Sequence, residues 1–267
     1  MIVGDIFGYK TRGDLGIEIE LETDSNRELP YSVDSGLPKT WKAEGDGSLR
    51  GNSIEYIFRK PLDLKETYIA LDDLTKSLKD KKITIRDSIR AGVHVHVNVQ
   101  DLTPTQVLNF ASVYYVLEEV LVDWCGQNRQ GNLFCLRNVD AEGSIQLIAN
   151  CFKRGRFGNL ADNSIRYASL NFCALPKFGS LEFRALKTEP SFDKIKMWSS
   201  LLLRLKNKSL EINTITEIME QFSIVGPKAW AEDILGDFYQ EVKDYPEFEQ
   251  KTWRGLRFAQ DLLFFSS

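Results

Sequence analysis

The chain has 267 residues, of which 43% are hydrophobic and 27% are charged; these values exclude a disordered chain and predict a globular protein with a sizeable core. Its 34 basic and 38 acidic residues give a formal net charge of −4. This balance excludes an overall basic surface, so we expect neither nucleic acid nor an anionic membrane as a general partner.

Strand and helix patterns follow one another through the first 210 residues. Strands are predicted where apolar and polar side chains alternate, and helices where apolar residues recur with the helical period. In chain order, the expected elements are strands over Leu15–Glu22 and Ser53–Phe58, a helix over Leu64–Lys79, a strand over Gly92–Val99, a helix over Pro104–Cys125 capped by Thr103, strands over Arg166–Ala174 and Ser180–Leu186, and a helix over Asp193–Lys208. Since strict βαβ alternation is missing, we expect an α+β fold with helices on one face of a sheet.

Two regions lack this regular pattern. Residues 126–163 are rich in Gly and Asn and predict loops around one short helix, SIQLIANCF. Long irregular stretches in compact domains often carry function, so we expect this one to face the substrate. After Lys208 the sequence predicts several short helices. We therefore divide the chain into a core over residues 1–210 and a helical extension over residues 211–267, packed together as a single domain.

The two histidines of the chain lie two residues apart in the strand pattern AGVHVHVNV. Successive side chains of a strand point to opposite faces, so His94 and His96 share one face. Two other predicted strands carry ionisable side chains at alternate positions: Glu18, Glu20 and Glu22 in GIEIELE, and Glu182 and Arg184 in SLEFRAL. Residues i and i+2 lie about 6.5 to 7 Å apart along a strand, so each strand can supply one ligand to each of two neighbouring metal ions.

Metal binding is one of two explanations for these strands. The polar face of a half-solvated sheet also carries charges, and the Asp46-Gly47 pair is also a turn signal. The combination favours metal, because crowded carboxylates repel one another unless cations compensate their charge. Asp46 and Glu55, in EGDGSLRGNSIE, add two more acids. Carboxylates mixed with imidazole suit Mg²⁺ or Mn²⁺, while Zn²⁺ stays open.

Five short motifs now stand in one order: GIEIE, DGSL followed by IEY, GVHVHV, RYASLN and SLEFR. In this order they resemble the amidoligase family, remote relatives of glutamine synthetase and glutamate–cysteine ligase, over roughly residues 15–205. The resemblance implies a bent antiparallel sheet whose open concave face holds ATP and Mg²⁺, or Mn²⁺, with helices on the other face. It also implies an ATP-dependent carboxylate–amine ligase. In that reaction the γ-phosphoryl group of ATP passes to a carboxylate, and an amine attacks the acyl phosphate to form an amide.

The resemblance also implies a role for each motif residue. Glu18 and Glu20 would hold different metal ions; His94 and Glu182 would join Glu18 on the ion nearest the transferred phosphoryl group, and Asp46 and Glu55 would join Glu20 on the second ion. Arg184 and Arg166 would contact phosphate or the substrate carboxylate, which arginine can bind through two hydrogen bonds, and His96 would line the ATP site. A structural salt bridge is the other explanation for Arg166. Asn163 and Asn171, which flank the RY pair, are candidates for site residues or for turn and strand fillers.

Two alternative functions stay open. A metallohydrolase would place His94, His96 and Glu182 around Zn²⁺, but it leaves the carboxylates of GIEIELE without a role. A non-catalytic relative would keep the fold and bind a nucleotide or another partner. No phosphate-binding loop motif occurs in the sequence, so the expectation of ATP binding depends on the family resemblance alone. The carboxylate and amine substrates, whether small molecules or peptides, are not identified by the sequence.

Cysteine usage and hydropathy bear on location. The four cysteines contain no Cys-x-x-Cys pair. No apolar run of about 18 residues occurs, and the first residues do not have the pattern of a signal peptide. We therefore expect a cytoplasmic protein with reduced thiols and no membrane segment.

Overall fold

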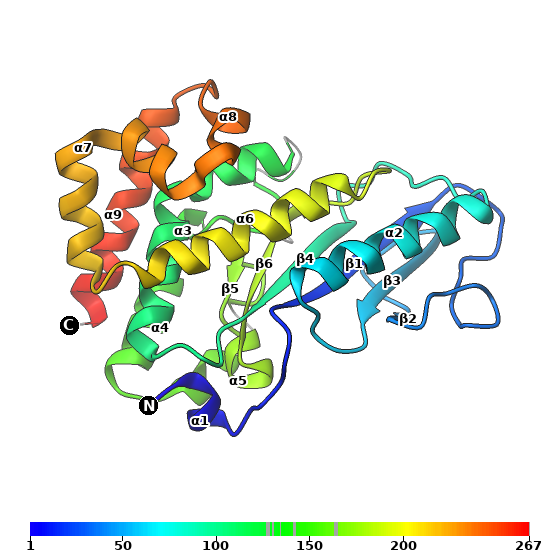
Figure 1. Cartoon of the computed structure of the whole chain (residues 1–267), viewed down its shortest axis with the longest axis horizontal. Coiled ribbons are helices and arrows are strands. Elements are labelled where there is room, and N and C mark those ends of the chain that lie inside the picture. Colours follow the sequence, from blue (N-terminus) through cyan, green and yellow to red (C-terminus); the bar gives the residue numbers. More distant parts are fainter. Residues whose placement is uncertain (127–128, 130, 134, 141–142, 163–164, 267) are drawn as a thin grey trace.

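The protein is built on one open antiparallel sheet of six strands (Figure 1). The computed structural model describes residues 1–126, 129, 131–133, 135–140, 143–162 and 165–266. In chain order the strands are β1 (Leu15–Thr23), β2 (Trp41–Glu44), β3 (Asn52–Phe58), β4 (Gly92–Asn98), β5 (Leu170–Asn171) and β6 (Ser180–Lys187). Their spatial order is β2-β3-β1-β4-β6-β5, so β1 and β4 lie at the centre of the sheet.

One face of this sheet is apolar. Ile17 and Ile19 of β1 and Val93 and Val95 of β4 are almost completely buried. Burying each such side chain contributes about 1.5 to 3 kcal/mol. A slip of one residue in strand pairing would turn all of these side chains to the other face, so burial fixes the register. The same register places the ionisable residues at the alternate positions on the opposite face.

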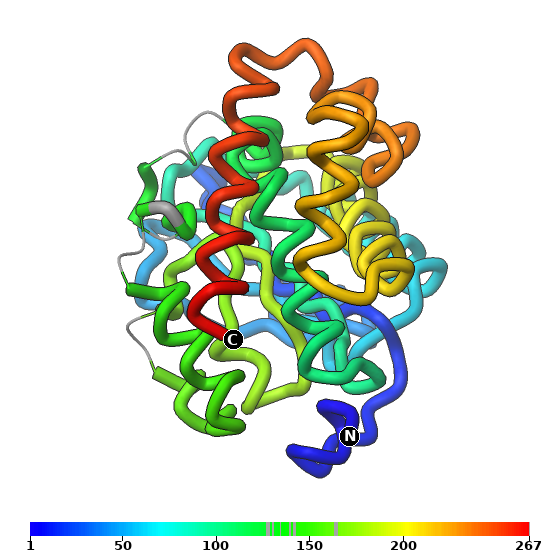
Figure 2. The backbone as a smooth tube through the Cα atoms, turned by 90° about the vertical axis from the view of Figure 1, so that its left-hand side faces the viewer, coloured from blue at the N-terminus to red at the C-terminus, as the bar shows by residue number. Residues whose placement is uncertain are grey.

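Helices cover the apolar face and extend beyond one end of the sheet (Figure 1). The α-helices of the described chain are α1 (Val3–Phe7), α2 (Leu64–Asp80), α3 (Pro104–Cys125), α4 (Ser144–Lys153), α5 (Ala174–Phe178), α6 (Asp193–Leu210), α7 (Ile215–Leu235), α8 (Tyr239–Val242) and α9 (Phe248–Ser266). Of these, α5 lies at the polar face. α6 packs on β4 and α3 packs on β6, while α9 runs along α3 (Figure 2). Because neighbours surround it, α3 is buried along nearly its whole length.

The starts of α2 and α3 follow from local sequence. Asp63 accepts a hydrogen bond from the Glu66 backbone N–H at 2.7 Å, and the Glu66 carboxylate accepts one from the Asp63 N–H at 3.3 Å. Thr103 and Gln106 form the same reciprocal pair at the start of α3, with Pro104 at the first helical position. Such pairs satisfy backbone N–H groups that have no partner within the helix. The predicted cap at Thr103 is confirmed.

Most predicted elements are confirmed. Four of the strands and the helix over Pro104–Cys125 begin and end within one residue of the predicted limits. The fifth predicted strand, over Arg166–Ala174, is wrong except at Leu170–Asn171, because the chain turns into α5 directly afterwards. The Asn171 side chain accepts a hydrogen bond from the Cys173 N–H at 2.8 Å, which favours that turn. The short edge strand β2 was not predicted, since four residues carry too little alternation.

The C-terminal part also differs from the prediction. Gly226, with φ of 82°, is not helical and divides α7 into two helices, and α8 is only four residues long, so the prediction of short helices is confirmed there. It is wrong for α9, which is one helix of 19 residues. α7 and α9 both pack on α3, and this packing is not visible in a local pattern. The short helix predicted within residues 126–163 is confirmed as α4, whereas residues 127, 128, 130, 134, 141, 142 and Asn163 lie outside the described residues. Within the described part of the chain, no helix is long and apolar enough to cross a membrane.

Candidate active site

Antiparallel pairing brings the predicted site residues opposite one another on the polar face of the sheet. The opposed pairs are Glu18 with His94, Glu20 with Glu55, and His96 with Glu182. Directly opposite side chains have Cβ atoms about 4.5 to 5.5 Å apart. The four strands β3, β1, β4 and β6 thus deliver carboxylates and imidazoles to one small area.

A β-bulge directs Arg184 over this area. Val93 pairs with Leu186 and Val95 pairs with Phe183. Between these pairs β4 has one residue, His94, whereas β6 has two, Arg184 and Ala185, so both lie opposite His94. Bulges bend a strand and re-aim its side chains, and they are frequent beside active sites. Here Nη1 of Arg184 lies 3.4 Å from Nδ1 of His94, and the guanidinium forms an ion pair with Glu182.

His94 lies at the centre of the cluster and is buried. Its Nδ1 is 3.0 Å from Oε2 of Glu18 and 3.6 Å from Oε1 of Glu182. Its Nε2 is 3.8 Å from Oε1 of Glu20. One imidazole therefore lies within 4 Å of three carboxylates.

His96 lies beside the cluster. Its Nε2 is 3.4 Å from Oε1 of Glu18, and its Nδ1 is 3.2 Å from the Ser180 hydroxyl. The ring meets the Phe178 ring edge-on, with centroids 5.8 Å apart. Gly16 is opposite His96 in the register, and a Cβ there would lie 3.3 Å from Cβ of His96. The glycine leaves room for the imidazole, and a glycine within a strand is the signal that marks such a close approach.

Asn171 holds the remaining carboxylate oxygen of Glu182. Its Nδ2 donates to Oε2 of Glu182 at 2.6 Å, and both residues are buried. Glu182 is thus held by Asn171 on one side and by Arg184 on the other. The structure places Asn171 among the site residues and not among the strand fillers.

The ligand atoms of these side chains form three overlapping groups that have the spacing of metal sites. The groups are Glu20, Asp46 and Glu55; Glu18, Glu55 and His94; and Glu18, His96 and Glu182, with ligand atoms within 4.8 Å of one another in each. The first group is the set expected for the second ion. For the first ion we expected Glu18 with His94 and Glu182, and among the described residues the structure instead divides the two histidines between two groups.

The charges of the cluster are unevenly compensated. Burial and the neighbouring charges of Glu18 and Glu20 raise the pKa of Glu55 to about 8. Burial also acts to raise the pKa of Glu18, but contacts with His94 and His96 outweigh it and hold that pKa well below the ordinary value. The donor set therefore fits a divalent cation, which would compensate the carboxylates around Glu55.

One cavity of about 280 Å³ is lined by every predicted site residue: Glu18, Glu20, Asp46, Glu55, His94, His96, Arg166, Glu182 and Arg184. Arg166 is exposed; its guanidinium bonds to the hydroxyl of Tyr167 and lies 4.4 Å from that ring's centroid. No carboxylate partner of Arg166 occurs within the described residues. Lys177 of α5 also lines the cavity and was not predicted, since no strand pattern marks it. The cavity is thus lined by both carboxylates and cations.

A second cavity of about 520 Å³ adjoins the first and shares Glu18, Glu55, His96 and Phe178 with it. The residues that line it include Ile57, Pro61 and Phe178, and the cations Lys42, Arg59 and Lys60. Lys42 pairs with Glu44 at 2.6 Å, while Arg59 and Lys60 are exposed. The sequence did not predict this cavity, because Arg59 and Lys60 directly follow a strand and belong to no recognisable motif.

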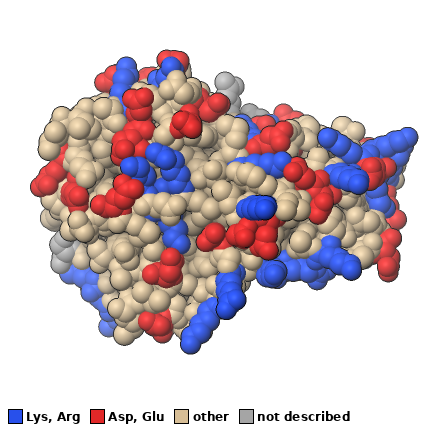
Figure 3. Space-filling model, in the orientation of Figure 1, with Lys and Arg blue, Asp and Glu red and all other residues tan. Residues whose placement is uncertain are grey.

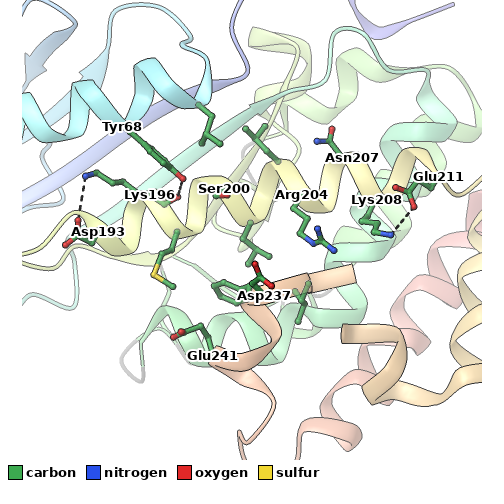
Figure 4. Close-up of a pocket in the computed structure, with 16 residues that line it drawn as sticks. Tyr68, Asp193, Lys196, Ser200, Arg204, Asn207, Lys208, Glu211, Asp237 and Glu241 are labelled. Carbon is green, nitrogen blue, oxygen red and sulfur yellow. Dashed lines mark hydrogen bonds and ion pairs between the residues drawn. The ribbon is translucent and has the colours of Figure 1, made fainter. Parts of the chain in front are cut away.

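A larger hollow, of about 940 Å³, lies along α6 and is lined by none of the candidate metal ligands (Figure 4). Several of its charged side chains have partners: Lys208 pairs with Glu211 at 3.0 Å, and Arg204 donates to the carbonyls of Asp233 and Ile234 at the end of α7. The face seen in Figure 3 carries Lys and Arg beside Asp and Glu. Neither feature resembles the carboxylate cluster on the sheet.

An open antiparallel sheet whose polar face gathers carboxylates, imidazoles and arginines defines an enzyme with a charged active-site cavity. The family model described as "Putative amidoligase enzyme" matches residues 15–206, the segment that holds all six strands. The chain belongs to this amidoligase family, and it is therefore a ligase in the general sense of that family. No curated protein matches the chain.

Proposed function

We propose that the protein is an ATP- and Mg²⁺-dependent carboxylate–amine ligase that works through an acyl phosphate. The observation that carries the proposal is the single cavity in which six candidate metal ligands face two arginines and His96. Phosphoryl transfer requires mainly positioning and positive charge around the transferred group. A cavity lined by carboxylates that can hold cations and by arginines that can hold anions supplies both.

Glu20, Asp46 and Glu55 would hold one Mg²⁺, and Mn²⁺ would fit the same oxygens. Glu18 would hold a second ion with one or both histidines, and Glu182 would complete its ligands. When bound, such ions neutralise phosphate oxygens and orient the phosphates.

Arg184 is the residue best placed to meet the transferred phosphoryl group. Burial acts to lower its pKa, but the charge and hydrogen bond of Glu182 raise it, so the guanidinium stays charged. A planar guanidinium can contact two oxygens of a phosphate or carboxylate. Arg166 and Lys177, which line the same cavity, would hold the substrate carboxylate close to it.

The adjoining cavity suits the nucleotide. Its volume of about 520 Å³ lies within the usual range for ligand sites, and its apolar walls can receive a purine ring. His96 lines both cavities, so it would lie where the phosphates pass from one to the other. Arg59 and Lys60 would compensate phosphate charge at the rim.

Thermal unfolding with ATP and excess Mg²⁺ tests the proposal. A ligand at about 100 times its Kd stabilises by about 2.7 kcal/mol, which corresponds to roughly 5 to 10 °C for a chain of this size. The shift should require both ATP and Mg²⁺, and it should disappear with EDTA and in Glu18→Ala. A positive result justifies screening pairs of carboxylates and amines by ADP release.

Glu22→Ala is the matched control. Glu22 lies on the same strand and face as Glu18, but it pairs with Arg86 and accepts the Arg50 N–H at 2.7 Å, away from the cavity. Glu22→Ala should lower the melting temperature and keep the shift with ATP and Mg²⁺. A shift with Zn²⁺ alone and none with ATP would refute the ligase proposal and favour a metallohydrolase.

A further inference from the structure

Arg129 is a buried cation that the sequence analysis did not single out. It follows α3 within the irregular stretch that we expected to face the substrate, and its side chain is only 1% exposed. Its Nε donates to the carbonyl of Ala185 at 3.0 Å, and its Nη2 donates to the carbonyl of Arg184 at 2.8 Å. These carbonyls belong to the two residues of the β6 bulge opposite His94. The guanidinium therefore clamps the bulge that aims Arg184.

Gly92 shows that the guanidinium lies on the carboxylate face of the sheet. Gly92 is two residues before His94 on β4, so its missing side chain would point to the same face as His94. A Cβ there would lie 2.9 Å from Nη2 of Arg129 and 3.4 Å from Oε2 of Glu20. The same Glu20 oxygen accepts the Gly92 N–H at 2.7 Å. Arg129 and Glu20 thus both approach the position that Gly92 leaves free, although no ion pair joins them among the described residues.

The burial of Arg129 is not explained by its hydrogen bonds alone. Its Nη1 is buried and has no hydrogen-bond partner among the described residues. A buried guanidinium is costly to desolvate unless opposite charge and hydrogen bonds compensate it. The carboxylate beside it, Glu20, belongs to the candidate metal cluster. Arg129 is thus hydrogen-bonded to the bulge and lies near the candidate metal cluster.

We propose that Arg129 is a positioning residue of the metal centre, which fixes the bulge carrying Arg184 and lies beside Glu20. The inference rests on the metal centre of the proposed function. Groups that orient metal ligands without touching the metal typically change metal affinity 10- to 100-fold when they are replaced. Arg129 would act in this way mainly through the bulge, on Arg184 and on the Glu182 carboxylate that Arg184 pairs with, and on Glu20 as a nearby positive charge.

Arg129→Lys tests the proposal with the charge retained. Lysine cannot reproduce the fixed fork that reaches two carbonyls, so the bulge loses its clamp while the local charge stays the same. Arg204→Lys is the matched control, because Arg204 also donates its Nε and Nη2 to two successive carbonyls, those of Ile234 and Asp233. That fork lies at the end of α7, away from the cluster.

The readout is the affinity for Mn²⁺ alone, measured from the free-Mn²⁺ electron paramagnetic resonance signal, with melting temperatures recorded for each protein. Arg129→Lys should bind Mn²⁺ at least about tenfold more weakly than the wild type, whereas Arg204→Lys should stay within about twofold. Equal affinities in the two variants would overturn the role of Arg129 and leave the metal centre intact. A wild type that binds no Mn²⁺ would overturn the metal centre itself, and the role of Arg129 with it.

Gly92→Ala keeps the test decisive if Arg129→Lys does not fold. The new methyl group would meet the far end of the Arg129 side chain, which must shift while its charge is retained. We expect weaker Mn²⁺ binding here as well. Gly158→Ala is its control, since a Cβ at Gly158 has no neighbour within 4 Å. Unchanged Mn²⁺ affinity in Gly92→Ala would count against the proposal.

Discussion

Glu55→Gln should stabilise the metal-free protein at pH 8. The pKa of Glu55 is raised from an ordinary 4.5 to about 8 in the folded state by burial and by the charges of Glu18 and Glu20. Between these pH values the folded state binds one proton more than the unfolded state, so the free energy of unfolding falls as the pH rises. Glutamine does not titrate, so the free energy of unfolding of the variant lacks this decrease with pH.

The magnitude follows from the width of that pH window. The range from 4.5 to about 8, at about 1.4 kcal/mol per pH unit, sets an upper limit of about 5 kcal/mol. Glu55 is only partly buried, so screening by water reduces the expected gain at pH 8 to about 2 to 3 kcal/mol. At pH 5 the two proteins should have nearly equal stability, because Glu55 is still protonated in the folded state.

Urea unfolding in EDTA at pH 5, 6, 7 and 8 measures the difference. Glu118, whose pKa burial raises to about 7, adds its own pH dependence, but it does so equally in both proteins. Glu220→Gln is the control, because Glu220 is an exposed carboxylate on α7 that does not contribute to the raised pKa of Glu55. Excess Mg²⁺ should reverse the order at pH 8, since the variant lacks one ligand. If Glu55→Gln were no more stable than the wild type at pH 8 in EDTA, the repulsion argument would be refuted.

Three further variants test the site and the fold. Glu182→Gln should reduce ligase turnover at least about 100-fold, measured as amine-dependent ADP release, and it should lower the melting temperature because Arg184 loses its ion-pair partner; retained turnover would remove Glu182 from the metal ligands. Thr103→Ala should lower the free energy of unfolding by about 1 kcal/mol through loss of the α3 cap, measured in urea, and an unchanged midpoint would contradict this. Leu202→Ala, at a fully buried position on α6, should cost about 2 to 5 kcal/mol in the same assay, and a cost below 1 kcal/mol would mean that α6 is not held by its apolar face.

The sequence by itself determined which side chains share a face. Alternation along a strand is a local property, so Glu18 with Glu20, His94 with His96, and Glu182 with Arg184 could be grouped from their spacing alone. Thr103 and Pro104 likewise marked the start of α3, because a helix cap involves residues only a few positions apart. The family resemblance placed these groups in one site, and the match over residues 15–206 agrees with it.

Only the tertiary structure decided how these groups meet. The register between β1, β4 and β6 sets which histidine lies closest to which carboxylate, and it depends on core packing and on the bulge. The bulge in turn is held by Arg129, whose partners lie 55 and 56 positions further along the chain. The C-terminal helices α7 and α9 are held in place by packing on α3. Such contacts join residues that are distant in sequence, so no local pattern carries them.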